Sequence, residues 1–163
     1  MITIGIDPGI ERTGVGIVEE EKGKLKLLYS KLIKTESKLP QSVRLLQLYT
    51  ELTEIISMYK IDHASVEKLF FIKNVKTAMA VSEARGVILL TLQNKNISIF
   101  EYTPLQIKQA LVGYGRGTKD QVQYLVKIIL SLDEKAIQDD VADGIACAIT
   151  HINSYKLISK IKK

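Results

Sequence analysis

Apolar and polar residues alternate with two different periods along this chain, and the two periods predict its strands and helices. Short β-branched runs such as residues 1–6, and roughly alternating stretches such as 24–35, predict strands. Apolar residues that recur every three or four positions, as in 39–60, predict amphipathic helices. The predicted strands are 1–6, 13–19, 24–35, 63–67 and 97–102. The predicted helices are 39–60, 75–93, 104–111, 119–132 and a last one from 139 or 140 to about 154.

Three helix starts carry residues that cap helices. Thr103 precedes a proline at the first helical position, and Thr118 follows a glycine-rich loop. Asn74 stands directly before the helix predicted at 75–93. We expect these three residues to set where their helices begin.

The order of these elements predicts an α/β fold with a five-stranded mixed sheet and helices on both faces. Short turns join the first three strands, which therefore form an antiparallel meander. Helical crossovers lead to the fourth and fifth strands, which makes those strands parallel. At 163 residues the simplest organisation is one domain over residues 1–155, followed by a basic C-terminal tail at 156–163.

Composition restricts the partners and the compartment. The net charge of +5 and the pI near 9.2 suit a polyanionic partner. No run of eighteen apolar residues occurs, and no basic region precedes the first strand, so we expect no membrane span, no signal peptide and a cytoplasmic protein. The single cysteine, Cys147, excludes a disulfide framework and a cysteine-rich zinc site, and we expect it to be a buried structural thiol.

Acidic residues stand where the predicted elements would meet. Asp7 ends the first strand before a Pro-Gly turn, and Glu67 ends the fourth. Asp140 and Asp143, three residues apart, project from one face of the last helix. Four converging carboxylates favour a hard cation such as Mg²⁺ or Mn²⁺. The alternative is that each acid has a local role: Asp7 in a turn, Asp139 or Asp140 as a helix cap, and Asp143 as a partner of the helix dipole. Asp139 is four residues from Asp143, so spacing alone does not decide whether Asp139 or Asp140 belongs to the site.

Five segments resemble the RuvC family of Holliday-junction resolvases. They are IGIDPG, TGVGIV, VEKLFF, ARG at 84–86 and DDVADGIACAITH at 139–151. Their order and spacing match the family nearly end to end. The resemblance places the family's acidic quartet, which is both catalytic and metal-binding, on Asp7, Glu67, Asp140 and Asp143, and leaves Asp139 as the cap.

The resemblance implies an RNase H-like nuclease domain over residues 1–155 that works as a homodimer. Family members nick two opposing strands of a four-way DNA junction symmetrically, in recombination and DNA repair. They leave 5′-phosphate and 3′-hydroxyl ends and use Mg²⁺ or Mn²⁺, for which we expect two ions in each active site. We also expect the family's branch-migration motor as a partner.

The same resemblance suggests residues that contact DNA. Phe70 matches an aromatic residue that stacks on DNA near the exchange point. Lys108 and Lys119 match basic residues beside the scissile phosphate, where Lys119 would act in catalysis by neutralising developing charge. Further candidates for phosphate contacts, each equally compatible with a solvated surface charge, are Lys73, Lys76 and Arg116.

The helix predicted at 75–93 has more apolar surface than one sheet face needs, and the family dimerises largely through this helix. A core helix covered on both sides would show the same pattern without a dimer. The interface candidates are Ala78, Val81, Ala84 and Ile88. His63 and His151 lie in apolar surroundings, and we expect structural roles for both.

Three other functions fit part of the pattern. Actin-like kinases also open with a strand, a DxG turn and a glycine-bearing hairpin, but they need a second comparable domain that 163 residues cannot hold. A related RNase H-like nuclease acting on RNA–DNA hybrids would share the fold and the metals, and only substrate tests separate it. A non-catalytic junction-binding module predicts a missing acid, and none of the four is missing.

Overall fold

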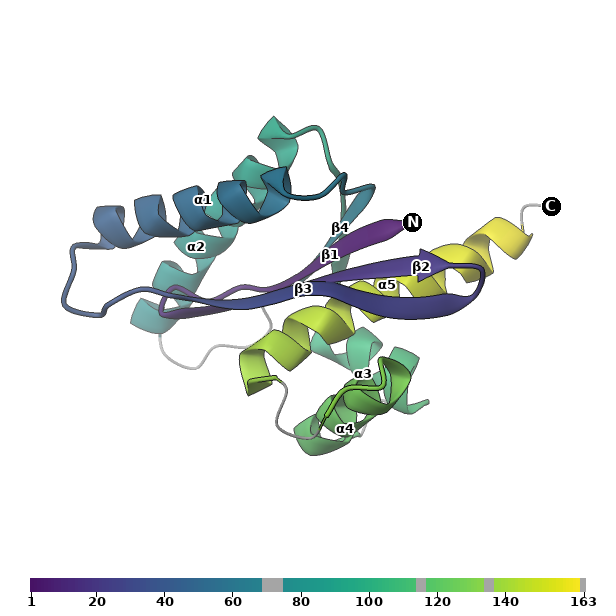
Figure 1. Cartoon of the computed structure of the whole chain (residues 1–163). Helices are drawn as coiled ribbons and strands as arrows, with labels where there is room; N and C mark the ends of the chain where they lie inside the picture. The colour runs from purple at the N-terminus through teal and green to yellow at the C-terminus, as the bar shows by residue number, and fades with distance from the viewer. Residues whose placement is uncertain (69–74, 114–116, 134–136, 162–163) are drawn as a thin grey trace.

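The structure is a computed structural model that describes residues 1–68, 75–113, 117–133 and 137–161. A five-stranded sheet with the order β3-β2-β1-β4-β5 forms its centre (Figure 1). The antiparallel strands are β1 (Ile2–Asp7), β2 (Arg12–Glu21) and β3 (Lys24–Lys34). The strands parallel to β1 are β4 (His63–Glu67) and β5 (Ser98–Tyr102). The predicted mixed sheet is confirmed.

The register between neighbouring strands places two acidic residues at one edge of the sheet. In the parallel pair β1–β4, Ile6 lies opposite Val66, so Asp7 and Glu67 follow at adjacent strand ends. In the antiparallel pair β1–β2, Asp7 lies opposite Gly14. Because ligand sites in such sheets lie at the carboxyl ends of parallel strands, this edge is where a site is expected.

Helices cover both faces of the sheet (Figure 1). On one face lie α1 (Gln41–Ser57) and α2 (Val75–Asn94), which contact each other. On the other face α5 (Asp139–Ile161) crosses β1 and β2, and α3 (Pro104–Val112) and α4 (Lys119–Ile129) pack against it. Within the described segments, no helix combines the length and apolar character needed to cross a membrane.

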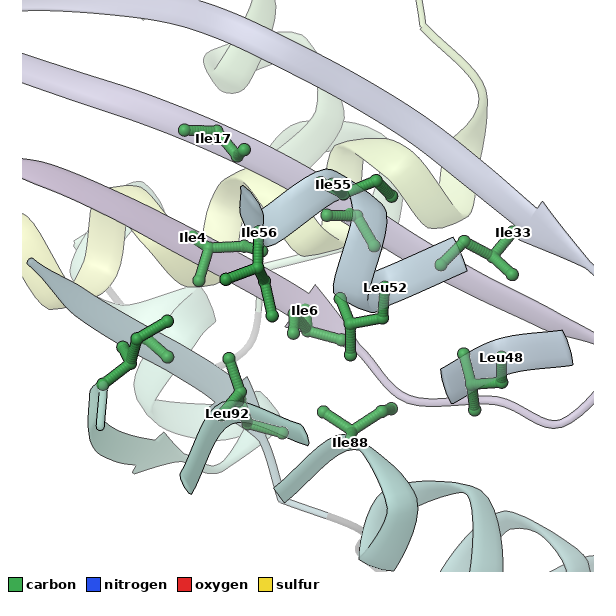
Figure 2. Packing of buried hydrophobic residues seen from close by; sticks show 14 of the residues in the cluster. Ile4, Ile6, Ile17, Ile33, Leu48, Leu52, Ile55, Ile56, Ile88 and Leu92 are labelled. Carbon is green, nitrogen blue, oxygen red and sulfur yellow. The ribbon is translucent and has the colours of Figure 1, made fainter. Parts of the chain in front are cut away.

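Branched aliphatic side chains fill the space between the sheet and the first helix layer. Figure 2 shows Ile4, Ile6 and Ile17 of the sheet beside side chains of α1 and α2. The labelled partners on the two helices are Leu48, Leu52, Ile55, Ile56, Ile88 and Leu92. All are at most 4% exposed, and burying one such side chain stabilises the fold by roughly 1.5–3 kcal/mol. This packing fixes the crossover helix α1 and thereby holds β4 beside β1.

Two helices differ from the sequence prediction at their ends. α1 begins at Gln41 rather than residue 39, because Pro40 disfavours helical geometry at the residue before it and serves as the N-cap itself. It ends at Ser57 rather than residue 60, where the amide of Met58 donates to Ile55 in a tightened last turn. The helix α5 continues to Ile161, so most of the segment expected to be a basic tail is helical.

A hydrogen-bonded aromatic group accounts for part of this extension. Nε2 of His151 lies 2.9 Å from Nδ1 of His63, and the Tyr102 hydroxyl lies 3.0 Å from Nδ1 of His151. Phe100 stacks on the His151 ring at a centroid distance of 4.2 Å, and the Tyr155 ring packs edge-on against His63. Burial, and then the charge of His63, lower the pKa of His151 to about 4. The structural roles expected for both histidines agree with these contacts.

The single cysteine is also structural. Cys147 is fully buried in α5, and the Ser65 hydroxyl donates to its carbonyl oxygen at 2.8 Å. Burial raises the pKa of the thiol far above its ordinary value, so a reactive thiolate is disfavoured. The prediction of a buried structural thiol is confirmed.

Candidate functional site

The site begins with the two strand-end acids. Asp7 and Glu67 lie at the ends of adjacent parallel strands, and their carboxyl groups hydrogen-bond each other. Both side chains are half-buried. Two carboxyl groups in contact cannot both carry a full negative charge without repulsion, so they share a proton or require a cation between them.

The helix α5 brings two more acids to the same place. Asp140 and Asp143 lie in its first turns, and the negative charges of both act on Asp7. Close contact with the sheet makes this possible: a Cβ on Gly14 would lie 1.7 Å from the carbonyl oxygen of Asp140. Gly5 and Gly144 form a second such contact, because a Cβ on Gly5 would lie 2.1 Å from the carbonyl oxygen of Gly144. Only residues without side chains allow the helix to start this close to β1 and β2.

Three cations flank the four carboxylates. On one side, Nε of Arg12 lies 2.6 Å from Oδ2 of Asp140. On the other, Nζ of Lys119 lies 2.7 Å from Oδ2 of Asp143, and the positive charge of Lys108 acts on Glu67. The Thr118 capping box fixes the start of α4 and therefore the position of Lys119.

A cavity of about 160 Å³ opens beside the carboxylates. The acids Glu67 and Asp143 and the lysines Lys108 and Lys119 form its polar wall. Its apolar wall consists of Pro104, Ile107 and Val122. A nucleic-acid strand matches both walls, because its phosphates suit the lysines and the faces of its bases suit the apolar side chains.

Burial, and after it the crowding of like charges, raises the pKa values of the carboxyl groups. Burial, together with the charges of Glu67, Asp143 and Asp140, raises the pKa of Asp7 to about 8. Burial and the charge of Asp143 raise the pKa of Glu67 to about 7, and burial also raises that of Asp143. Burial alone would lower the pKa of Lys119, but its ion pair with Asp143 outweighs that effect and raises it. The neighbouring arginine and lysines therefore do not fully neutralise the four carboxylates.

This donor set fits a hard divalent cation. Oxygen ligands from several carboxylates are the ones that Mg²⁺ and Mn²⁺ prefer, and a bound ion would replace the protons that crowding now favours. Among the described residues, however, no three acidic, histidine or cysteine side chains form a ready-made ligand group. Asp140 and Asp143 are each paired with a cation instead. A metal ion would therefore compete with Arg12 and Lys119 for the negative charges of these two side chains.

The structure does not reach every predicted DNA contact. It brings Lys108 and Lys119 to the carboxylates, as described above. Phe70, Lys73 and Arg116, as well as the side chain of Lys76, lie outside the described residues. Their roles stay predictions, as does the cap expected at Asn74, which also lies outside.

Half of the predicted dimer interface is wrong. Ala84 and Ile88 are fully buried between α2 and the rest of the core, so neither can contact a second copy. The apolar stripe that contains them is the one that packs inside the domain. Ala78 and Val81 are only half-buried, and they stay candidates.

Two features of the site escaped the sequence prediction. The first is the close contact between Gly14 and the start of α5. A glycine inside a strand often marks the close approach of another backbone, so Gly14 was a usable sequence signal for this contact. Arg12 gave no signal, since its partner Asp140 lies 128 positions away in the sequence. Only the fold brings that arginine to the site.

Comparisons with known proteins show the family to which the chain is similar. The family model described as crossover junction endodeoxyribonuclease RuvC matches residues 3–151. The RuvC of Caldicellulosiruptor saccharolyticus is 53% identical over 155 residues, which cover 94% of this chain and 93% of that protein. The RuvC of Halothermothrix orenii is 48% identical over 160 residues, which cover 98% and 97%.

A solved structure shares the whole fold. Thermus thermophilus RuvC in complex with a Holliday junction substrate superposes with a TM-score of 0.92 at 31% identity, covering 98% of this chain and 97% of that one. The RNase H-like fold implied by the sequence resemblance is therefore confirmed, and nucleases of this family depend on metal ions. The chain belongs to the RuvC family of crossover junction endodeoxyribonucleases.

Proposed function

We propose that this protein resolves four-way DNA junctions by nicking two opposing strands symmetrically, in recombination and DNA repair. The observation that carries the proposal is the convergence of Asp7, Glu67, Asp140 and Asp143 from three separate elements beside a lysine-lined cavity. A related protein of the same fold is described in complex with a Holliday junction substrate. Cleavage would leave 5′-phosphate and 3′-hydroxyl ends.

The four carboxylates would hold the metal, which we propose to be two Mg²⁺ ions, with Mn²⁺ as a substitute. When bound, such ions activate water and stabilise the leaving oxygen of a phosphodiester. Lys119 would face the scissile phosphate and neutralise charge that develops on its oxygens. Lys108, which also lines the cavity, would bind the negatively charged phosphates of the same DNA strand.

Symmetric nicking requires two active sites, and we propose that a homodimer supplies them. One stripe of α2 points away from the core and carries the exposed residues Val75, Met79 and Leu90. Gly86 lies on the same stripe, and a Cβ there would meet nothing within 4 Å. A second copy could therefore approach this stripe closely, and two-fold symmetry would direct two sites at two strands of one junction. Met79→Glu should weaken dimerisation in sedimentation experiments.

The wider setting is also a proposal. DNA junctions lie in the cytoplasm of a bacterial cell, so we propose that the protein acts there. A branch-migration motor would present the junction, as the family resemblance implies.

The test is Mg²⁺-dependent cleavage of a synthetic four-way junction, compared with linear duplex and RNA–DNA hybrid of the same sequence. We expect paired nicks in the junction only, abolished by Asp7→Asn. Cleavage of the hybrid would indicate a ribonuclease H instead. Tight junction binding without cutting, in both Mg²⁺ and Mn²⁺, would leave a binding module and contradict the proposed catalysis.

A further inference from the structure

An arginine closes one side of the carboxylate group. Arg12 is the first residue of β2, five positions after Asp7, and its side chain reaches across to the first turn of α5. Its Nε lies 2.6 Å from Oδ2 of Asp140. The two side chains are 45% and 24% exposed, so the pair sits at the rim of the site and a large molecule can reach it.

The geometry of the pair leaves part of the guanidinium group available. In the described part of the chain, Arg12 binds Asp140 through Nε and one carboxylate oxygen, not through the two-pronged contact that arginine can make. The terminal amino groups are therefore left to bind a second acceptor. A phosphodiester oxygen is the acceptor that arginine binds best.

The ion pair also competes with a metal ion for the same oxygen. Asp140 carries one negative charge, and a divalent cation that uses Oδ2 as a ligand would stand within a few ångströms of the guanidinium group. Two positive charges at that separation repel each other strongly. Even on the two different oxygens of Asp140, the guanidinium group and a metal ion would share one negative charge, so each lowers the affinity of Asp140 for the other.

The pair is not what holds α5 in place. The start of α5 is fixed by the contact of Asp140 with Gly14 and by the buried side chains Val141 and Ile145. Exposed ion pairs contribute little to stability. A role in placing the helix therefore does not account for an arginine at this position.

We propose that Arg12 is a positioning residue that couples the binding of DNA to the binding of metal. In the free enzyme its guanidinium group neutralises Asp140 and keeps the metal affinity low. A DNA phosphate then draws the guanidinium group away and frees Asp140 for the metal, so each ligand increases the affinity for the other. The DNA step of this exchange rests on the proposed function, whereas the competition at Asp140 does not.

Two affinities, measured separately, test the coupling. Mn²⁺ binding to the full chain without DNA is followed by electron paramagnetic resonance of the free ion, and junction binding in EDTA is followed by fluorescence anisotropy. We expect Arg12→Gln to bind Mn²⁺ about three- to tenfold more tightly, because a competing charge is gone. We expect it to bind the junction about three- to tenfold more weakly, with a salt dependence smaller by about one charge. Arg12→Lys should restore most of both affinities.

The matched control is Lys31→Gln. Lys31 forms a 2.8 Å pair with Glu51 of α1, the helix on the other face of the sheet from α5, so the variant loses one positive charge that pairs with none of the four carboxylates. We expect it to leave the Mn²⁺ affinity unchanged. Equal shifts in both variants, or an unchanged Mn²⁺ affinity in Arg12→Gln, would overturn the proposal. A wild-type protein that binds duplex as tightly as the junction would refute the proposed function but leave the competition at Asp140 to be decided by the Mn²⁺ titration.

Discussion

β4 and α5 bring ionisable groups into contact near both of their ends, and the two groups have opposite effects on stability. At the carboxylate end, Asp7 and Glu67 meet Asp143, and burial, followed by the neighbouring negative charges, raises the pKa values of all three. At the histidine end, His63 and His151 share one hydrogen bond, and burial keeps His151 neutral. Both groups are built on the same strand and the same helix.

The difference separates a functional group from a structural one. Each ring nitrogen of His151 has a partner, so burying it satisfies its polar atoms without adding charge. The carboxylates instead repel one another, which lowers stability until a cation binds. One helix therefore carries a stabilising contact toward one end and a destabilising one at the other.

The largest expected effect comes from removing the repulsion itself. Asp7→Asn should lower junction cleavage by roughly a thousandfold or more, because it removes a proposed metal ligand. The same change should stabilise the metal-free protein by about 1–3 kcal/mol at pH 8, since a crowded carboxyl group is gone. Cleavage rates and urea unfolding in EDTA measure the two effects. Asp133→Asn, at an exposed position, should change neither, and a destabilised Asp7→Asn would contradict this account of the site.

A second variant tests how the carboxylate end is assembled. Gly14→Ala would place a methyl group 1.7 Å from the Asp140 carbonyl oxygen, which belongs to a backbone that cannot move aside locally. We expect a loss of roughly 3 kcal/mol or more in the free energy of unfolding. Glu54→Ala is the control, because Glu54 is exposed on α1 and alanine favours the helix. Equal stabilities of the two variants would show that α5 does not depend on this close contact.

The sequence predicted local features of this site better than distant ones. The strand ends at Asp7 and Glu67 were readable because each acid closes a short predicted strand. A glycine inside a strand signals a close approach, but which element docks on Gly14 depends on the tertiary fold, and no local pattern encodes it. The apolar stripe of α2 predicted a covered face but not which partner covers it, so Ala84 was assigned to a dimer although it is core.

The end of α5 shows the same limit. The sequence predicted its end near residue 154, before the lysine-rich end of the chain, yet the helix runs on to Ile161. Tyr155 packs against the histidine group, and Lys156 pairs with Glu20 of β2 at 2.6 Å. Such tertiary contacts extend a helix beyond what its own sequence favours.

At the histidine end, we expect a loss of stability without a loss of chemistry. His151→Phe keeps an aromatic ring but removes the partner of Nδ1 of His63 and one of the two partners of the Tyr102 hydroxyl, which also bonds Ser154. The free energy of unfolding should fall by about 2–3 kcal/mol. Cleavage per folded molecule, measured well below the unfolding temperature, should stay within about twofold of wild type. A large loss of cleavage in a folded variant would show that the two ends are coupled.

The two ends should also respond to pH with opposite sign. The folded-state pKa of His151, about 4, lies below its ordinary value of 6.5, so the unfolded chain binds the extra proton between these values. Stability from this group is therefore lost as the pH falls from about 6.5 to about 4. The raised pKa values of Asp7 and Glu67 work the other way in the metal-free protein, where stability is lost as the pH rises from about 4 to about 8.

Urea unfolding in EDTA across this range measures both effects. Each should amount to about 1–3 kcal/mol. His151→Phe should remove the loss on the acid side, and Asp7→Asn should reduce the loss on the alkaline side. Saturating Mn²⁺ should also reduce the alkaline loss in the wild type. An alkaline loss that persists unchanged in Asp7→Asn would mean that other groups cause it.

The smallest expected effect concerns how the carboxylate end receives its lysine. Thr118 and Thr103 form matching capping boxes, in which each hydroxyl accepts a backbone N–H at 3.2 Å. Replacing either with alanine should lower the free energy of unfolding by about 1 kcal/mol. Only Thr118→Ala loosens the turn that carries Lys119, the residue paired with Asp143, whereas Lys108 lies beyond the first turn of α3, which Thr103 caps. We therefore expect equal stability losses but a several-fold larger loss of cleavage in Thr118→Ala, because a lysine held loosely spends less time at the phosphate. Equal cleavage in the two variants would mean that Lys119 is placed by its ion pair alone and that the cap contributes only stability.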